Sequence, residues 1–189
     1  MKSDIVLAGV GGQGILTIAA ILGQVAVAEG IHVKQSEIHG MSQRGGSVFS
    51  HLRLSTDPIW ADQITAGTAD ILVAMEPMEA MRYRQMLSPD GVLITNASPV
   101  KNIPDYPQGE ALIAQIKGIA NAKVIDADAI AKKLNNPRSV NIVLLGAISK
   151  YVRLIESEIL EKAIAARFAS KGEAVVSANL EAYHAGRQA

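Results

Sequence analysis

The chain is predicted to form a single α/β domain over residues 1–189, with a Rossmann-like, open and mostly parallel sheet, helices on both faces and a helical C-terminal part. Three observations predict this fold class. A strand-like apolar run, a glycine-rich turn and a helical segment open the chain. Short apolar runs then alternate with helical patterns, and the pattern is mostly helical from Ser139 onward. Continuous apolar runs are typical of strands buried on both faces, and their alternation with helices favours a covered parallel sheet.

The first pair of elements carries the most specific signal. A strand is expected over residues 4–9 and a helix over about residues 14–29, because a glycine just beyond is a favourable helix stop. Between them the chain reads Gly9-Val10-Gly11-Gly12-Gln13-Gly14. Gly9 would permit a tight exit from the strand, Gly11 would let the backbone approach a phosphate, and Gly14 would let the helix pack close to the sheet.

A glycine turn between a strand and a helix is typical of a phosphate-binding site. The N-terminus of the helix offers free backbone N–H groups and a partial positive charge to an anion. The position after a strand and before a helix is the context that gives the Gly-x-Gly-x-x-Gly pattern its meaning. We therefore predict a phosphate-bearing ligand at this turn. The alternative is a glycine turn that serves only strand–helix packing.

Two further strands and a polar loop are predicted after the first helix. Alternation places strands over residues 31–36 and 47–54, with residues 37–46 as a loop. One face of the later strand would carry Val48, Ser50, Leu52 and Leu54, and the other Phe49, His51 and Arg53. Ile59 and Trp60 would add a short strand. Trp60, the only tryptophan, fits an exposed interface anchor as well as a half-buried core residue.

The remaining elements follow from apolar runs, prolines and glycines. Buried strands are expected over residues 70–75, 92–95 and 123–126, with Asp90 and Gly91 forming a turn before the second of these. Pro77 would begin a helix, and three prolines make residues 99–108 a loop. Helices are predicted over residues 139–154, 157–168 and 173–183.

Composition excludes several classes of protein. Lys and Arg total 18, as do Asp and Glu, so the net charge is zero and a basic footprint for nucleic acid is absent. The absence of cysteine excludes a disulfide framework, a nucleophilic cysteine and thiolate-ligated zinc or iron–sulfur sites on this chain. Low charge and a mean hydropathy of +0.20 favour surface buried against a partner or in a homo-oligomer, unless a large core accounts for them.

The apolar N-terminal stretch does not predict a membrane span. Residues 5–28 are interrupted by glycines and glutamines, and the longest run free of both covers only residues 15–22. That run is too short to cross a bilayer. We interpret the stretch as a buried strand and helix of a soluble, cytoplasmic protein.

A second candidate anion site lies in the loop over residues 37–46. Its Arg44 stands beside Gly45 and Gly46, so a guanidinium fork and exposed backbone N–H groups could bind one anion. The alternative is a loop in which Arg44 is a solvated charge. Because ligands of open α/β sheets lie beyond the carboxyl ends of the strands, this loop and the glycine turn should share one crevice.

These segments resemble a known family. The stretch Gly9-x-Gly-Gly-Gln-Gly14, with Glu37-x-His-Gly-Met-Ser-Gln-Arg-Gly-Gly-Ser47 after it, is similar to the gamma-type domain of 2-oxoacid:ferredoxin (pyruvate/ketoisovalerate-type) oxidoreductases. The C-terminal half of that domain resembles Asn141-x-x-x-Leu-Gly146-Ala147 and Asn179-x-x-Ala-Tyr183. The resemblance covers nearly the whole chain, and the form of the second motif is most similar to the beta subunits of indolepyruvate ferredoxin oxidoreductases.

The resemblance implies the activity of a complex. Its members decarboxylate a 2-oxoacid on thiamine diphosphate, pass electrons through iron–sulfur clusters to ferredoxin, and release the acyl group on coenzyme A. The thiamine diphosphate and the clusters are expected on a partner subunit. This chain would bind coenzyme A and make subunit contacts, with an aryl 2-oxoacid such as indolepyruvate as substrate. The candidate binding residues are Gly9, Gly11, Gly12, Gln13, Gly14, Ser42, Gln43, Arg44, Gly45 and Gly46.

Other hypotheses stay open. The chain could belong to a pyruvate, 2-oxoglutarate or branched-chain 2-oxoacid enzyme, or serve only as a scaffold with an empty turn. It could also be a free-standing NAD- or FAD-binding oxidoreductase, since Glu37 lies 23 residues after Gly14, near where such folds place a ribose-binding acid. We interpret His39 as a hydrogen-bonding loop residue rather than an acid or base. No metal site and no catalytic residue are predicted.

Overall fold

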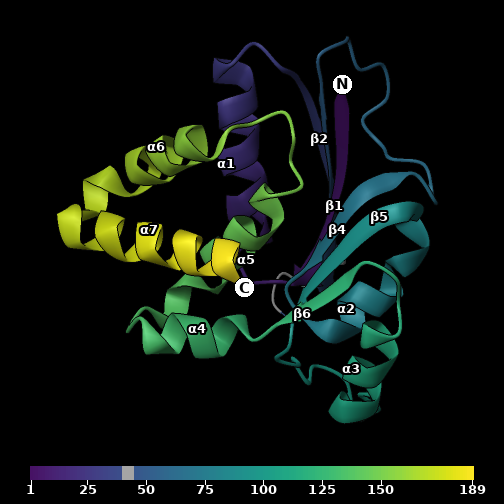
Figure 1. The fold of residues 1–189 in the computed structure, drawn as a ribbon. Coiled ribbons are helices and arrows are strands. Elements are labelled where there is room, and N and C mark those ends of the chain that lie inside the picture. Colours follow the sequence, from purple (N-terminus) through teal and green to yellow (C-terminus); the bar gives the residue numbers. More distant parts are fainter. Residues whose placement is uncertain (40–44) are drawn as a thin grey trace.

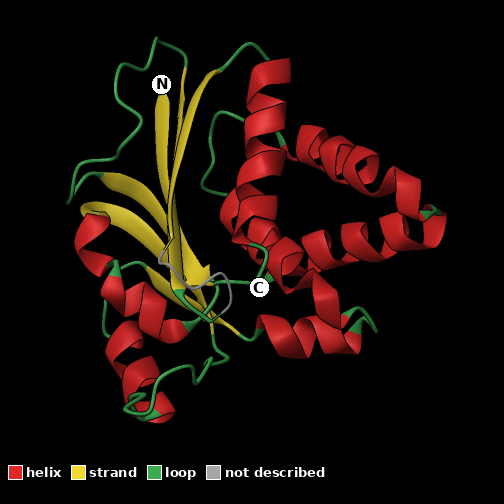
Figure 2. Ribbon diagram, turned by 180° about the vertical axis from the view of Figure 1, so that it is seen from behind, coloured by secondary structure: helices red, strands yellow, loops and turns green. Residues whose placement is uncertain are grey.

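The computed structural model describes residues 1–39 and 45–189. Within these ranges the chain forms a six-stranded sheet with helices on both faces (Figures 1 and 2). The strands are β1 (Lys2–Val10), β2 (His32–His39), β3 (Ser47–Ser55), β4 (Ala69–Ala74), β5 (Leu87–Asn96) and β6 (Ala122–Ile125). The α-helices are α1 (Ile15–Ala28), α2 (Pro77–Arg82), α3 (Gly109–Lys117), α4 (Ala127–Lys133), α5 (Val140–Ser149), α6 (Ser157–Phe168) and α7 (Glu173–Gln188). Short 3-10 helices are η1 (Arg84–Met86), η2 (Pro137–Ser139) and η3 (Ala169–Lys171).

The sheet is mostly parallel, as predicted. Its strand order is β2-β3-β1-β4-β5-β6, and the pairs β1–β4, β4–β5 and β5–β6 are parallel. Strand β3 is antiparallel to both of its neighbours, β2 and β1. It therefore separates β2 from β1, whereas a Rossmann unit places these two consecutive strands side by side.

Two hydrophobic cores flank the sheet. Because successive residues of a strand point to opposite faces, Ile5 and Leu7 of β1 enter one core while Val6 and Ala8 enter the other. The first core lies under α1, α5, α6 and α7, and the second under α2 and α3 (Figures 1 and 2). Burial on both faces explains the continuous apolar character of β1. Among the described helices, none is long and apolar enough to cross a membrane.

The C-terminal helices α5 and α7 cross at two glycines. A Cβ atom on Gly146 would meet the carbonyl oxygen of Tyr183, and one on Gly186 would meet that of Val143. The two backbones therefore approach each other at both positions. Tyr183 is fully buried at this crossing, and its hydroxyl lies 3.2 Å from Ser157 Oγ on α6.

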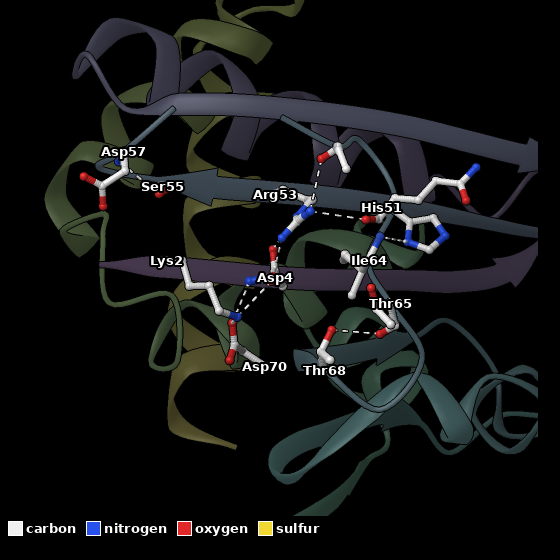
Figure 3. Close-up of polar contacts among 12 residues, drawn as sticks. Lys2, Asp4, His51, Arg53, Ser55, Asp57, Ile64, Thr65, Thr68 and Asp70 are labelled. Atoms are coloured by element: carbon white, nitrogen blue, oxygen red, sulfur yellow. Dashed lines mark hydrogen bonds and ion pairs between the residues drawn. The ribbon is translucent and has the colours of Figure 1, made fainter. Parts of the chain in front are cut away.

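An ion-pair network joins β1, β3 and β4 at the amino end of β1 (Figure 3). The distance from Asp4 Oδ1 to Arg53 Nε is 2.8 Å, and Lys2 Nζ lies 2.8 Å from Asp4 Oδ2 and 3.1 Å from Asp70 Oδ2. Burial alone would raise the pKa of Asp4, but hydrogen bonds and charges from Arg53 and Lys2 outweigh it and hold that pKa below its ordinary value. The network fixes the end of the sheet opposite the glycine turn.

Two predicted elements near β2 and β3 were wrong. Strand β2 continues through His39, so Glu37 belongs to a strand and not to the predicted loop, because the facing residues of β3 extend the ladder there. Ile59 and Trp60 form no strand, and Trp60 is 90% exposed. The exposed alternative for Trp60 is therefore the correct one.

Further differences concern β5 and the helices. The predicted turn at Asp90 and Gly91 lies inside β5, where its register with β4 shifts, so the glycine marks a bulge. The helix predicted over residues 139–154 ends at Ser149, whose hydroxyl donates to the carbonyl of Gly146 and competes with the helix ladder. The short helices α3 and α4 were not predicted, although Asp126 caps α4 by accepting from Ala129 N–H at 2.9 Å.

Candidate functional site

The glycine turn between β1 and α1 is fixed largely by the side chain of Gln13. Its Oε1 accepts from Val10 N–H at 2.7 Å, and its Nε2 donates to the carbonyl of Met75 at 3.2 Å. The backbone N–H of Gln13 donates in turn to the carbonyl of Val10 at 3.1 Å. Gln13 therefore ties the turn to the carboxyl end of β4, a role that the sequence analysis did not anticipate.

The three glycines of the Gly-x-Gly-x-x-Gly pattern, Gly9, Gly11 and Gly14, have different structural roles. A Cβ atom on Gly9 would lie 2.7 Å from Ile15 Cδ1, so close packing requires a glycine there, but Gly9 lies within β1, which continues to Val10, and does not itself form the predicted tight exit. Gly14 has a φ of 82° and faces Asn141 of α5, so its close contact is with a helix and not with the sheet. The backbone N–H of Gly11 donates to the carbonyl of Gly46 at 2.9 Å, and the approach of the Gly11 backbone to a phosphate stays a prediction.

The N-terminus of α1 is the part of the turn suited to an anion. Among the described residues, no acceptor is found for the N–H groups of Gly12 and Gly14. The helix has no side-chain cap at Gly14 and no acidic residue in its first turn. The helix dipole therefore acts at this end with no negative side chain of α1 to compensate it.

A cavity of about 580 Å³ opens at this helix N-terminus. It lies where β1, β4 and β5 end, the edge at which open α/β sheets bind ligands. Its walls come from the glycine turn, the segment after β5, α4 and the start of α5. The lining residues are Gly12, Gln13, Gly14, Met75, Asn96, Ser98, Pro99, Val100, Asp128, Pro137, Arg138, Val140 and Asn141.

Several polar residues of this cavity were not predicted. Asn96, the last residue of β5, accepts from Ala127 N–H at 3.1 Å and donates to Asp128 Oδ2 at 2.7 Å. Arg138 is exposed and supplies the one cation among the described lining residues. Asn141 donates to the carbonyl of Gly14 at 3.3 Å. Of these residues, only Asn141 was singled out in the sequence analysis, as part of the family resemblance. Asn96 could have been found from its position at the carboxyl end of a predicted strand, where ligand sites of such sheets lie.

Gly45 and Gly46 are the described residues of the second predicted anion site, and they lie beside the glycine turn. Gly46 accepts the Gly11 N–H, and the carbonyl of Gly45 accepts from Asn102 Nδ2 at 2.7 Å. The two segments therefore lie next to each other, but neither Gly45 nor Gly46 lines the cavity, so the crevice predicted to be shared by the loop and the turn stays a prediction. Ser42, Gln43 and Arg44 lie outside the described residues.

Two buried carboxylates hold the neighbouring segments. Glu76 accepts from Tyr106 Oη and from Glu79 N–H, both at 2.5 Å, and Glu79 accepts from Ser47 Oγ. Burial, with the hydrogen bond and negative charge of Glu76, raises the pKa of Tyr106 far above its ordinary value, so this phenol stays a donor. These contacts fix the start of β3 and the segment before α3 around α2.

Glu37, the residue on which the dinucleotide alternative rests, is not part of the cavity. Glu37 is exposed on β2, and β3 separates that strand from β1. It does not line the cavity at the glycine turn, so the position expected for a ribose-binding acid is not reproduced. His39 ends β2. Within residues 1–39 and 45–189, no group of three or more potential metal ligands comes together.

Comparisons with known proteins were made with the whole sequence. Residues 4–189 match the family model described as pyruvate ferredoxin/flavodoxin oxidoreductase. The indolepyruvate oxidoreductase subunit IorB of Pyrococcus horikoshii is 37% identical over 155 residues, covering 78% of this chain and 76% of the relative. IorB of Archaeoglobus fulgidus is 34% identical over 194 residues, covering 98% and 94%.

A solved structure has a similar fold. The 2-oxoglutarate:ferredoxin oxidoreductase from Magnetococcus marinus, with 2-oxoglutarate, coenzyme A and succinyl-CoA bound, superimposes with a TM-score of 0.78 at 22% identity. The match covers 99% of this chain and 30% of that chain. At this identity the likeness establishes the fold.

Proposed function

The chain belongs to the pyruvate ferredoxin/flavodoxin oxidoreductase family, and we propose that it is the non-autonomous subunit of an oxidoreductase that acts on an aryl 2-oxoacid such as indolepyruvate. The substrate class rests on the two indolepyruvate relatives, which are 34% and 37% identical to this chain. The complex would work in the cytoplasm and transfer its electrons to ferredoxin.

Coenzyme A is the proposed ligand of the cavity at the glycine turn. The observation that carries this assignment is the uncapped N-terminus of α1, which opens into a cavity of about 580 Å³ beside Arg138. The N–H groups of Gly12 and Gly14 would donate to phosphate oxygens, and the guanidinium of Arg138 would pair with the same charge. The cavity also falls within the size range of small-molecule sites, roughly 300–1,000 Å³.

Thiamine diphosphate and the iron–sulfur clusters are assigned to a partner subunit. The absence of cysteine from the sequence supports this division, because thiolates are the usual ligands of such clusters. Thiamine diphosphate would supply the decarboxylation of the 2-oxoacid. This chain would bind and orient coenzyme A, so that its thiol meets the acyl group at high effective concentration.

The assignment can be tested in the assembled complex. The chain would be produced with its thiamine-bearing partner, and ferredoxin reduction measured anaerobically against coenzyme A concentration with indolepyruvate, phenylpyruvate, pyruvate and 2-oxoglutarate. Arg138→Ala is expected to raise the KM for coenzyme A about tenfold, the loss of one charge-assisted contact, with little change in the KM for the 2-oxoacid. Arg44→Ala tests the second predicted anion site in the same way.

A matched control is Lys117→Ala, which removes an exposed cation of α3, on the other side of the sheet. It should leave both KM values unchanged. An unaltered KM for coenzyme A in both the Arg138 and Arg44 variants would overturn the assignment of the site. A preference for pyruvate or 2-oxoglutarate over both aryl substrates would overturn the assignment of the substrate.

A further inference from the structure

A second cavity shares Arg138 and Asn141 with the cavity at the glycine turn. Its volume is about 450 Å³, and it forms where the start of α1, η2, the end of α6 and the start of α7 meet. Arg138 and Asn141 line both cavities, so the two are neighbours that share a wall.

The second cavity concentrates positive charge in a chain of zero net charge. Arg138, Arg167 and Lys171 line it, and no acidic residue is found among its described lining residues. None of these three cations makes an ion pair with a carboxylate in the described part of the chain. Like charges around one cavity repel one another, and a bound anion would relieve that repulsion.

The remaining walls add donors suited to a phosphoryl group. Thr17 supplies a hydroxyl, Asn136 an amide, and Lys171 Nζ lies 5.4 Å from the ring centroid of Phe168, which restricts the ammonium group. Helix α7 begins beside Lys171 at Gly172 without a side-chain cap. Its first turn carries Glu173, whose carboxylate offsets the positive end of the helix dipole, so the positive charge at the cavity comes from the three cations. Arginine forks and backbone donors together are typical of phosphate recognition.

We propose that this second cavity binds a phosphoryl group, contributed by the far end of the ligand whose other phosphates lie at the glycine turn. The identity of that ligand rests on the proposed function, because coenzyme A carries a pyrophosphate and, apart from it, a 3′-phosphate on the ribose. The wall shared at Arg138 and Asn141 allows one ligand to occupy both cavities. A separate phosphate ester is the other source of the same chemistry.

The test compares coenzyme A with dephospho-coenzyme A, which lacks only the 3′-phosphate, by isothermal titration calorimetry on the full chain. The wild type should bind coenzyme A at least about tenfold more tightly. Replacing Arg167 and Lys171 together by Gln should remove most of that preference and leave the affinity for dephospho-coenzyme A unchanged. Both residues are exposed, so the fold should tolerate the change, which thermal melting would verify. Lys117→Gln on α3 is the matched control.

The outcomes separate this inference from the proposed function. Equal affinity for the two compounds, or a preference that survives in the double variant, would overturn the inference and leave coenzyme A at the glycine turn. If neither compound binds, inorganic phosphate and pyrophosphate are titrated. Their binding, lost in the double variant, would support a phosphoryl site for a separate ester and count against coenzyme A. No binding of any of the four probes would overturn both assignments.

Discussion

Gly14 has a φ of 82° at the N-cap of α1, and its Cα faces the side-chain amide of Asn141. A Cβ atom added there would lie 2.7 Å from Asn141 Nδ2, which now donates to the Gly14 carbonyl. Any larger residue must therefore adopt a left-handed backbone and also displace the amide. Gly14 therefore couples the N-terminus of α1, the proposed anion site, to the start of α5.

The substitution Gly14→Ala should lower the free energy of unfolding by about 2–4 kcal/mol, the sum of the left-handed backbone cost and local overpacking. Urea denaturation would measure the loss. Gly67→Ala is the matched control, because Gly67 has a φ of 78° but no atom within 4 Å of an added Cβ. It should cost only the backbone term, about 1–2 kcal/mol. Equal losses in the two variants would show that Asn141 moves aside freely.

His51 gives the fold a pH dependence of its own. Its ring is buried, and its Nδ1 accepts from Ile64 N–H at 3.0 Å, which requires a neutral imidazole. Burial, with a smaller contribution from Arg53, lowers the pKa of His51 below 6.5 despite the opposing charge of Asp62. Because the folded-state pKa lies below the unfolded one, the stability that His51 contributes is full above about pH 6.5. It is lost as pH falls from there through the folded-state pKa.

The test compares the wild type with His51→Asn, whose amide oxygen can replace Nδ1 as acceptor without titrating. Between pH 7.5 and pH 5.5 the wild type should lose more unfolding free energy than the variant, by up to about 1.4 kcal/mol per pH unit below 6.5. Chemical denaturation at the two pH values measures both losses. An identical pH dependence of the two proteins would mean that His51 has the same pKa in the folded and unfolded states, which would contradict the prediction.

At the scale of elements, the antiparallel strand β3 determines which strand lies beside β1 and its glycine turn. It occupies the position beside β1 that a Rossmann fold gives to β2, so Glu37 is kept away from the turn. The alternation of β3 was readable from the sequence and its two faces were predicted correctly. Its neighbours were not predicted, since side-chain periodicity indicates which residues are buried but not which strands pair.

The candidate site was predictable only where it is local in sequence. The turn from Gly9 to Gly14 forms within a few residues of one strand–helix junction, so its pattern is visible along the chain. Arg138 lies in η2, which follows β6 and α4 along the chain, and this order of elements brings it to the same cavity. The sequence analysis did not predict α4. Exposed arginines outside a motif carry no periodic signal, and the structure was needed to place this one.

Replacing a helical glycine by alanine should have opposite effects at Gly146, which lies at the crossing of α5 and α7, and at Gly23, which does not. In Gly146→Ala the new Cβ would meet the backbone carbonyl of Tyr183, which no side-chain rotation can relieve, so the loss should reach about 3 kcal/mol or prevent folding. In Gly23→Ala, within α1, the nearest atom is Val33 Cγ2 at 3.9 Å. This control should gain about 0.5–1 kcal/mol from the reduced entropy of the unfolded chain. Thermal and urea unfolding measure both, and a Gly146→Ala protein as stable as the wild type would contradict the close crossing.

Across the whole molecule, the ion pairs that hold the sheet and the cavities proposed to bind ligand lie at opposite ends of the sheet. The ion pairs Asp4–Arg53, Lys2–Asp4 and Lys2–Asp70 join β1, β3 and β4 at the amino end of β1 (Figure 3). The cavity at the glycine turn and the cationic cavity beside it lie at the carboxyl end, among loops and helix termini. Changes at the cavities should therefore alter binding with little effect on the sheet, which makes KM and affinity informative readouts.

The isolated chain should be catalytically silent. It has no cysteine to ligate an iron–sulfur cluster, and the proposed function assigns the groups that accept electrons from the 2-oxoacid to the partner subunit. Purified alone and given indolepyruvate, coenzyme A and ferredoxin under anaerobic conditions, it should cause no bleaching of oxidised ferredoxin. Addition of the partner subunit loaded with thiamine diphosphate and iron–sulfur clusters should produce bleaching above that of the partner alone. Turnover by the chain on its own would refute its role as a non-autonomous subunit.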